Sequence, residues 1–208
     1  MARTTGSIGK ETEKRVLKEA LTLFAHHGYA AVSMRQIASA CGIQAGALYN
    51  YFPTKQSILH ALMLAHMNDL LDALNAQPKI ENPSQALEAF TRFHIRYHID
   101  KPEEVFIAYM ELRNLEADNY SSIMKLRQKY ERALRGILRE GQASGHFKID
   151  DVPVSTMAII SMMTGVNTWF RYGGRLGVKE IEKIYVNLVL SVVGLVPQNE
   201  SSRLEEFV

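Results

Sequence analysis

The chain is poor in cysteine and has no long hydrophobic run. Cys41 is its single cysteine, which excludes an intrachain disulfide and a zinc site built from several cysteines. The most apolar stretch, residues 184–196, is shorter than the roughly 20 residues that a membrane span needs. No apolar run opens the chain, so we expect neither a signal peptide nor a membrane segment. These absences predict a cytoplasmic protein.

Catalytic fingerprints are missing as well. We find no G-x-S-x-G, H-E-x-x-H, Walker or dinucleotide-binding pattern, so the sequence predicts no enzyme and no cofactor. His94 and His98 lie four residues apart, a spacing that is able to bind a metal on one helical face. Because no carboxylate or cysteine clearly joins them, we interpret them as packed or pocket-lining histidines and predict no metal site.

No segment alternates with the period of a strand, and apolar residues recur throughout at helical spacing. Prolines near the start of several segments and glycines after others mark where helices begin and end. The pattern predicts an all-α protein with nine helices. Their expected ranges are residues 10–27, 33–40, 44–51, 55–76, 83–99, 102–114, 119–144, 153–172 and 179–196, after a mobile arm over residues 1–9.

The charge is unevenly distributed, although the whole chain carries a formal charge of only +2. Residues 1–60 hold seven basic and three acidic side chains, which leaves 17 basic and 19 acidic ones in the remainder. A basic first third on a nearly neutral body is what a phosphate-binding head would look like. Chance variation in solvated charge explains the same numbers equally well, so charge alone does not decide.

Two short helices joined by a tight turn give the clearest motif. Ser33 is a good N-cap for the first helix, and Cys41-Gly42-Ile43 supplies the turn. The second helix, residues 44–51, would enter the major groove of DNA with its N-terminal residues nearest the bases. We expect Leu48 to face inward and Phe52 to pack beneath the motif. The spacing predicts a helix-turn-helix over residues 33–52.

The run GYAAVSMRQIASACGIQAGALYNYFPTKQSIL, residues 28–59, resembles the DNA-binding signature of the TetR family of bacterial regulators. The resemblance covers the glycine-aromatic pair, the Ser33 cap, the turn around Gly42, and the pattern from Gly46 to Phe52 followed by Lys55. It implies an N-terminal three-helix head on an antiparallel helical body. The implied domains are a DNA-binding domain over residues 9–70, a ligand-binding and dimerisation domain over 71–197, and a flexible tail over 198–208.

The resemblance also implies which residues contact DNA. Tyr49 and Lys55 correspond to phosphate contacts, and Lys55 is poorly placed for the dipole at a helix start, which favours that role. Tyr49 could instead support the head as a half-buried aromatic, and Lys55 could be a solvated lysine. Gln44 departs from the serine or threonine of many members, and glutamine pairs with adenine for about 1–3 kcal/mol. The implied DNA-binding set is Ser33, Arg35, Gln44, Ala45, Gly46, Tyr49, Asn50, Tyr51 and Lys55.

The last two helices are the expected homodimer interface, since residues 184–196 are too apolar for a monomer surface. Short stretches around Arg113 and after Trp169 are similar to TetR-like regulators that respond to acyl-CoA thioesters. The arginines there could equally cap helices, and the aromatic and methionine residues between could form an ordinary core. The candidate effector-binding set is Phe93, Tyr97, Tyr109, Met110, Arg113, Trp169, Arg171 and Arg175.

Together these features predict a dimeric repressor that binds a palindromic operator in double-stranded DNA and is released by a small apolar effector, such as an acyl-CoA. Three alternatives remain open at this point. The effector could be a lipophilic drug, as in a regulator of efflux. The protein could bind DNA without any ligand, or it could be a small helical enzyme, for which no catalytic constellation is present.

Overall fold

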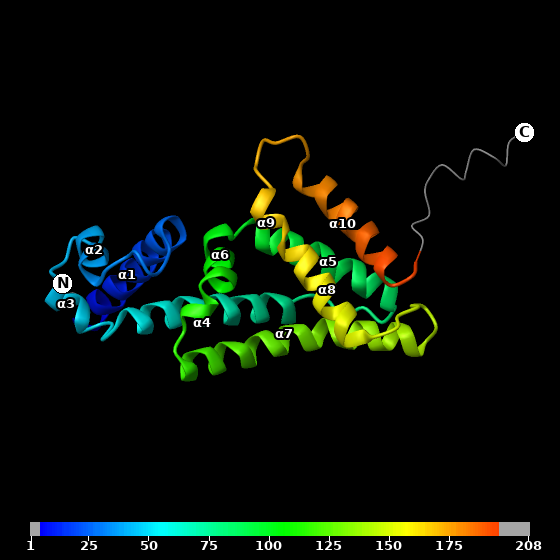
Figure 1. The fold of residues 1–208 in the computed structure, drawn as a ribbon, viewed down its shortest axis with the longest axis horizontal. Helices are drawn as coiled ribbons and strands as arrows, with labels where there is room; N and C mark the ends of the chain where they lie inside the picture. Colours follow the sequence, from blue (N-terminus) through cyan, green and yellow to red (C-terminus); the bar gives the residue numbers. More distant parts are fainter. Residues whose placement is uncertain (1–4, 196–208) are drawn as a thin grey trace, which may run out of the picture. The chain divides into compact units, whose positions relative to one another are not determined.

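The computed structural model describes residues 5–195, and within that range it contains helices and no strand (Figure 1). Residues 1–4 of the predicted mobile arm over residues 1–9 and the predicted tail over 198–208 lie outside the described residues, whereas residues 5–9 are helical and not a mobile arm. The helices are α1 Thr5–His27, α2 Met34–Ala40, α3 Ala45–Tyr49, α4 Lys55–Asn75, α5 Pro83–Ile99, α6 Pro102–Met110, the 3₁₀ helix η1 Leu112–Asn114, α7 Ala117–Ala143, α8 Val152–Thr164, α9 Val166–Trp169 and α10 Val178–Val192.

The all-α class is confirmed, and the described residues contain the nine predicted helices if η1 is counted with α6 and the four-residue α9 with α8. Four boundaries differ from the prediction by more than two residues, and one of them is the end of α10, which lies at Val192 instead of residue 196. Helix α1 begins at Thr5 instead of residue 10, because the apolar stripe that marked the helix has no signal in its first turns. The predicted helix over 102–114 breaks into α6 and η1 at Glu111. The helix predicted to reach residue 172 ends at Trp169, where Phe170 becomes extended.

Local capping explains several helix starts. Asn82 Oδ1 accepts a hydrogen bond of 3.0 Å from the backbone N–H of Gln85 at the start of α5. Asp151 Oδ1 accepts one of 2.7 Å from the N–H of Val154 at the start of α8. A proline follows each cap, at a position where its missing N–H costs nothing. These starts are therefore set by residues that are adjacent in sequence.

The chain divides into two compact units. The first unit consists of Met1–Ala73 with Lys101–Arg127, and the second of Leu74–Asp100 with Gln128–Val208. In the first unit α1 packs against α2 and α6, and α2 packs against α3. Its most deeply buried side chains include Phe24, Ile37 and Leu48. The first unit thus holds the predicted helix-turn-helix together with α6 and η1.

In the second unit α10 and α8 both pack against α5. Glu182 on α10 is buried, and its carboxylate accepts hydrogen bonds of 2.9 and 3.0 Å from the Arg96 guanidinium on α5. A bidentate pair of this kind satisfies a carboxylate that would be costly to bury alone. Across residues 5–195, we find no helix with the length and apolar character to span a bilayer.

Candidate nucleic-acid interface and ligand cavity

Ser33 begins α2 with a reciprocal pair of hydrogen bonds. Its backbone is extended, and its hydroxyl oxygen accepts from the N–H of Gln36 at 3.3 Å. In return, Gln36 Oε1 accepts from the Ser33 N–H at 2.8 Å. Two backbone donors that have no partner within the helix are thereby satisfied. The predicted cap is confirmed.

The turn between α2 and α3 depends on Gly42. Its φ of +65° lies in the left-handed region that side chains with a Cβ avoid. The chain reverses there, so that the Ile43 N–H donates to the Ala38 carbonyl oxygen at 3.0 Å. Cys41 is buried beside this turn, and burial raises the pKa of its thiol. A neutral, buried thiol is a packing group.

Helix α3 presents one side to the interior and the other to solvent. Leu48 is completely buried and Phe52 nearly so, as predicted. Tyr49 is 51% exposed, a value that is compatible with both of its interpretations, the phosphate contact and the half-buried support of the head. Gln44 is the N-cap residue of α3, yet its side chain makes no capping hydrogen bond and remains exposed. Gly46 and Asn50 are exposed as well, whereas Ala45 and Tyr51 are half-buried.

The other residues predicted to contact DNA lie beside α3 in the sequence. Arg35 is exposed on α2, and Ser33 is exposed although its hydroxyl is engaged in the cap. Lys55 is different, because its ammonium donates hydrogen bonds of 2.7 Å to the carbonyl oxygens of Tyr29 and Val32. Burial lowers the Lys55 pKa, an effect that the Glu111 carboxylate partly opposes. Lys55 therefore has a structural role that the sequence did not reveal, and its contact with phosphate stays a prediction.

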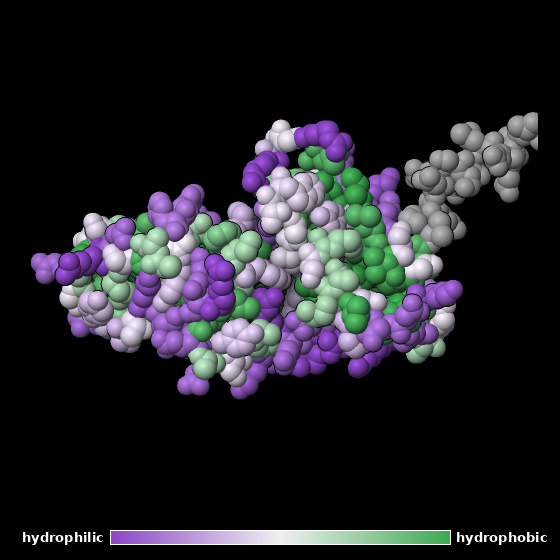
Figure 2. Space-filling model, viewed as in Figure 1, coloured by the Kyte–Doolittle hydropathy of each residue, from purple (hydrophilic) through white to green (hydrophobic). Residues whose placement is uncertain are grey.

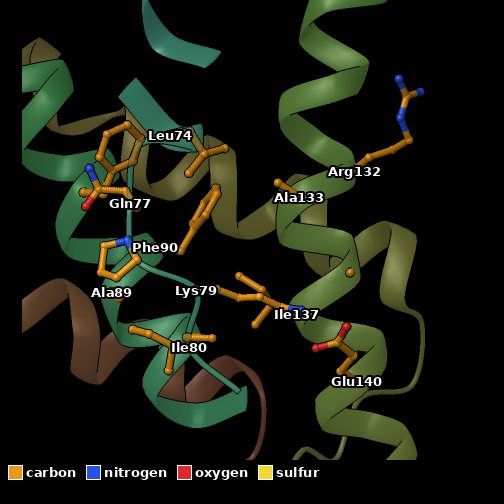
Figure 3. A pocket seen from close by; sticks show the side chains of 14 residues that line it. Leu74, Gln77, Lys79, Ile80, Ala89, Phe90, Arg132, Ala133, Ile137 and Glu140 are labelled. Carbon is orange, nitrogen blue, oxygen red and sulfur yellow. The ribbon is translucent and has the colours of Figure 1, made fainter. Parts of the chain in front are cut away.

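The second unit contains a cavity of about 380 Å³ between the end of α4, α5 and α7 (Figure 3). Phe90 and Phe93 enter it from α5 and Ile137 from α7, and most of its lining is apolar. The charged lining residues are Lys79 from the α4–α5 connection and Arg132 and Glu140 from α7, and the Arg132 guanidinium points away from Phe90 and Ile137 (Figure 3). The full lining is Leu74, Gln77, Pro78, Lys79, Ile80, Ala86, Ala89, Phe90, Phe93, Arg132, Ala133, Gly136, Ile137 and Glu140.

Of the predicted effector-binding residues within the described range, Phe93 alone lines this cavity. Tyr97 follows it on α5, with the two ring centres 5.6 Å apart. Trp169 is half exposed and stacks on Tyr185, with centres 6.5 Å apart. Arg171 donates to the neighbouring Phe170 carbonyl oxygen at 2.6 Å. The structure thus brings Phe93 and Tyr97 together, but Trp169 and Arg171 take part in local contacts of their own.

Arg175 is exposed in the segment that follows α9. The three remaining candidates belong to the first unit. The Arg127 guanidinium lies 4.4 Å from the centre of the Tyr109 ring, whereas Met110 and Arg113 are exposed. The sequence could not single out the cavity residues, because alanine on a helix and proline or isoleucine in a connection carry no distinctive signal.

His94 and His98 are packed histidines. The His94 ring nitrogens lie 2.9 Å from the Tyr130 hydroxyl and 3.2 Å from the Thr164 hydroxyl. The two imidazoles stack with their centres 3.8 Å apart, and burial lowers the His94 pKa well below its usual value. Both His94 nitrogens are therefore engaged by hydroxyl groups. Among residues 5–195, no group of three or more His, Cys, Asp or Glu side chains is arranged to hold a metal ion.

The comparisons with known proteins cover both halves of the chain. Residues 16–62 match the family described as bacterial regulatory proteins, tetR family. Residues 81–193 match the tetracyclin repressor-like C-terminal domain. The chain is 29% identical over 190 residues to the HTH-type transcriptional repressor KstR2 of Rhodococcus jostii, an alignment that covers 90% of this chain and 92% of the relative.

Two solved structures extend the similarity. The TetR family regulator PfmR of Thermus thermophilus is 32% identical with a TM-score of 0.77, and the match covers 85% of this chain and 97% of PfmR. AibR, solved in complex with isovaleryl coenzyme A and operator DNA, is 26% identical with a TM-score of 0.80 over 86% of this chain and 97% of AibR. The chain belongs to the TetR family of bacterial transcriptional regulators.

Proposed function

We propose that the protein is a cytoplasmic, dimeric repressor that binds a palindromic operator through α3 and leaves it when an acyl-CoA thioester occupies the cavity of the second unit. The observation that carries the DNA-binding part is the exposed side of α3, which presents Gln44, Gly46, Tyr49 and Asn50 to solvent. Small residues at the start of a recognition helix permit close approach to bases, and exposed polar side chains supply hydrogen bonds.

The experiment for DNA binding uses fluorescence anisotropy with fragments from the promoter regions of the protein's own and neighbouring genes. We expect Y49A to weaken binding to every fragment, since a phosphate contact carries no sequence information. Q44A should reduce the preference for the operator over unrelated DNA. Y120A is the matched control, because Tyr120 is 43% exposed on α7, outside the recognition helix. Equal affinity of wild type and Y49A for all fragments would refute this assignment.

The proposed dimer interface is the apolar surface of α8 and α10. Val154 and Met157 on α8 are exposed, as are Ile184, Leu188 and Val192 on α10. Figure 2 displays a broad hydrophobic area over these helices. A contiguous apolar patch on a protein marks an interaction site, and a two-fold dimer pairs the same patch on both copies. Two heads related by that symmetry would suit a palindromic operator.

The proposed effector site is the cavity that contains Phe90 and Phe93. Its volume of about 380 Å³ lies in the range of about 300–1,000 Å³ that is typical of small-molecule sites. The apolar lining suits an acyl chain, and the Lys79 ammonium suits the phosphates of coenzyme A. AibR, which is similar in fold and sequence, was solved with isovaleryl coenzyme A and operator DNA. An effector releases DNA only if its affinity for the free form exceeds that for the DNA-bound form.

Isovaleryl-CoA, a long-chain acyl-CoA and free coenzyme A form the test series, with thermal unfolding and release of labelled DNA as the measurements. A bound ligand raises the melting temperature by mass action. K79A should reduce the response to acyl-CoA, whereas R139A removes a cation on α7 that lies outside the cavity lining. Stabilisation by neutral lipophilic compounds alone would favour a drug-responsive regulator, and no response to either class would favour a DNA-binding protein without a ligand.

A further inference from the structure

Every polar group of Tyr29 makes a hydrogen bond. Its backbone N–H donates to Glu111 Oε1 at 3.0 Å, and its carbonyl oxygen accepts from Lys55 Nζ at 2.7 Å. Its hydroxyl accepts from Gln56 Nε2 at 3.1 Å, and the Lys55 ammonium lies 4.2 Å from the ring centre. Tyr29 belongs to the segment between α1 and α2, whereas Lys55 and Gln56 begin α4 and Glu111 joins α6 to η1.

Glu111 is a buried carboxylate, 7% exposed. Its second oxygen accepts a hydrogen bond from the side-chain amide of Asn114. A buried carboxylate is costly unless hydrogen-bond donors surround it, so the Tyr29 N–H and the Asn114 amide together define where Glu111 is able to lie. The preceding Gly28, with φ +80°, turns the chain out of α1 and brings the Tyr29 N–H to that position.

Gln56 completes the connection from the other side. Its amide nitrogen donates to the carbonyl oxygen of Asn114 as well as to the Tyr29 hydroxyl. Its amide oxygen accepts from the Glu116 N–H at 3.1 Å. One side chain at the start of α4 therefore reaches both the segment before α2 and the segment around η1. All of these residues lie in the first unit.

We propose that Glu111 and Gln56 are positioning residues for DNA binding, which hold α2 and α3 in the arrangement that fits the operator. They act through a group of contacts that we call the Tyr29 junction, which consists of Tyr29, Lys55, Gln56, Glu111 and Asn114. Only four residues separate Tyr29 from Met34, the first residue of α2, so a displacement of Glu111 is transmitted to the start of the helix-turn-helix. An effector that displaces η1 would have to break these hydrogen bonds. This last step rests on the proposed function, whereas the junction itself does not.

The test compares E111Q with E116Q in the full-length protein. E111Q keeps the size of the side chain and one acceptor oxygen, but directs an NH₂ donor at the Asn114 amide, which is also a donor. Glu116 is exposed, so E116Q removes the same charge without touching the buried carboxylate. The double variant E111Q/N114D restores a donor and an acceptor between the two side chains, with their roles reversed. Q56A breaks the junction from the α4 side at a less buried position.

Hydrogen–deuterium exchange of the segment over residues 28–40 and operator affinity without effector are the measurements. We expect E111Q and Q56A to increase exchange in that segment. E111Q should weaken operator binding about ten-fold, the equivalent of one lost hydrogen bond to a charged group, and Q56A by a similar factor, because Gln56 makes three hydrogen bonds with neutral groups. E116Q should behave as the wild type, and N114D should recover most of the loss in E111Q. If E111Q only destabilised the whole protein, exchange would instead be faster throughout the chain, and N114D would not restore operator binding.

Unchanged exchange over residues 28–40 in both E111Q and Q56A would overturn the proposal, as would an unchanged operator affinity in both. Hydrogen–deuterium exchange is measured without DNA. It therefore tests whether Glu111 and Gln56 order residues 28–40 even if the wild type binds none of the chosen fragments. In that case the proposed function fails, and local exchange in E111Q with recovery by N114D still supports the junction. If E111Q does not fold, Q56A provides the same two measurements.

Discussion

The ammonium of Lys55 donates to the backbone carbonyl oxygen of Tyr29 and also lies over the face of the Tyr29 ring, 4.2 Å from its centre. A single cation thus stabilises both the backbone and the side chain of a residue that lies 26 positions earlier. The position of lysine at the start of a helix is unfavourable for the helix dipole. These contacts explain why a cation is nevertheless stable there, without any contribution from DNA.

Replacing Lys55 by methionine should therefore lower the free energy of unfolding by about 1–2 kcal/mol, because two carbonyl oxygens lose a charged donor. Urea denaturation measures this change. K14M is the control, since Lys14 is exposed on α1. K55M could instead leave the free energy of unfolding unchanged and reduce the number of ions released on DNA binding by about one. In that case Lys55 contacts phosphate and does not stabilise the Tyr29 segment.

His66 should make the protein less stable as the pH falls. Burial, with a smaller contribution from the Lys101 and Arg127 charges, lowers the pKa of His66 from 6.5 to about 4. The unfolded chain binds this proton below about pH 6.5, whereas the folded chain does so only near pH 4. The contribution of neutral His66 to the free energy of unfolding is therefore fully present above pH 6.5. It is lost on acidification and amounts to at most about 3 kcal/mol.

The measurement is urea denaturation of wild type and H66L at several values between pH 4 and pH 7. H66L removes the titrating group from a buried position and keeps an apolar side chain there. We expect its unfolding free energy to fall less steeply with decreasing pH than that of the wild type. His94 contributes a slope of the same sign in both proteins, so the difference between them isolates His66. Parallel curves would contradict the prediction.

Replacing two glycines on α7 by alanine should change the stability of the protein in opposite directions. A Cβ at Gly141 would lie 2.0 Å from Cδ2 and 2.7 Å from Cγ of Phe147, whose ring is buried. G141A should therefore cost about 1–3 kcal/mol through overpacking. A Cβ at Gly136 has no atom within 4 Å, and alanine in a helix interior is favoured over glycine by about 0.5–1 kcal/mol. Thermal unfolding of both variants tests this difference in sign.

Charge on the apolar surface of α10 should prevent dimer formation. Leu188 is exposed between Ile184 and Val192 on that helix, and a buried glutamate at the proposed interface would lack a partner. We expect sedimentation velocity to give the mass of a dimer for the wild type and of a monomer for L188E. K179E is the control at the start of the same helix. A wild type that is monomeric at all concentrations would contradict the proposed interface.

The sequence alone determined the features that depend on neighbours a few residues apart. The Ser33 cap, the turn at Gly42 and the buried side of α3 follow from local hydrogen bonds and helical spacing, because each involves residues within about one helical turn. Helix boundaries without such local signals were less well predicted. The start of α1 at Thr5 lies before the apolar stripe that marks the helix.

The tertiary structure decided the contacts between distant segments. Glu111 interrupts a predicted helix and receives a hydrogen bond from the N–H of Tyr29, 82 positions away in the sequence. Lys55 was predicted from the sequence to contact phosphate, and its anchoring of the Tyr29 segment became visible only in the fold. The cavity, too, combines an irregular connection with α5 and α7. Neither periodicity nor capping contains information on these contacts, since both patterns describe only residues that are close together along one helix.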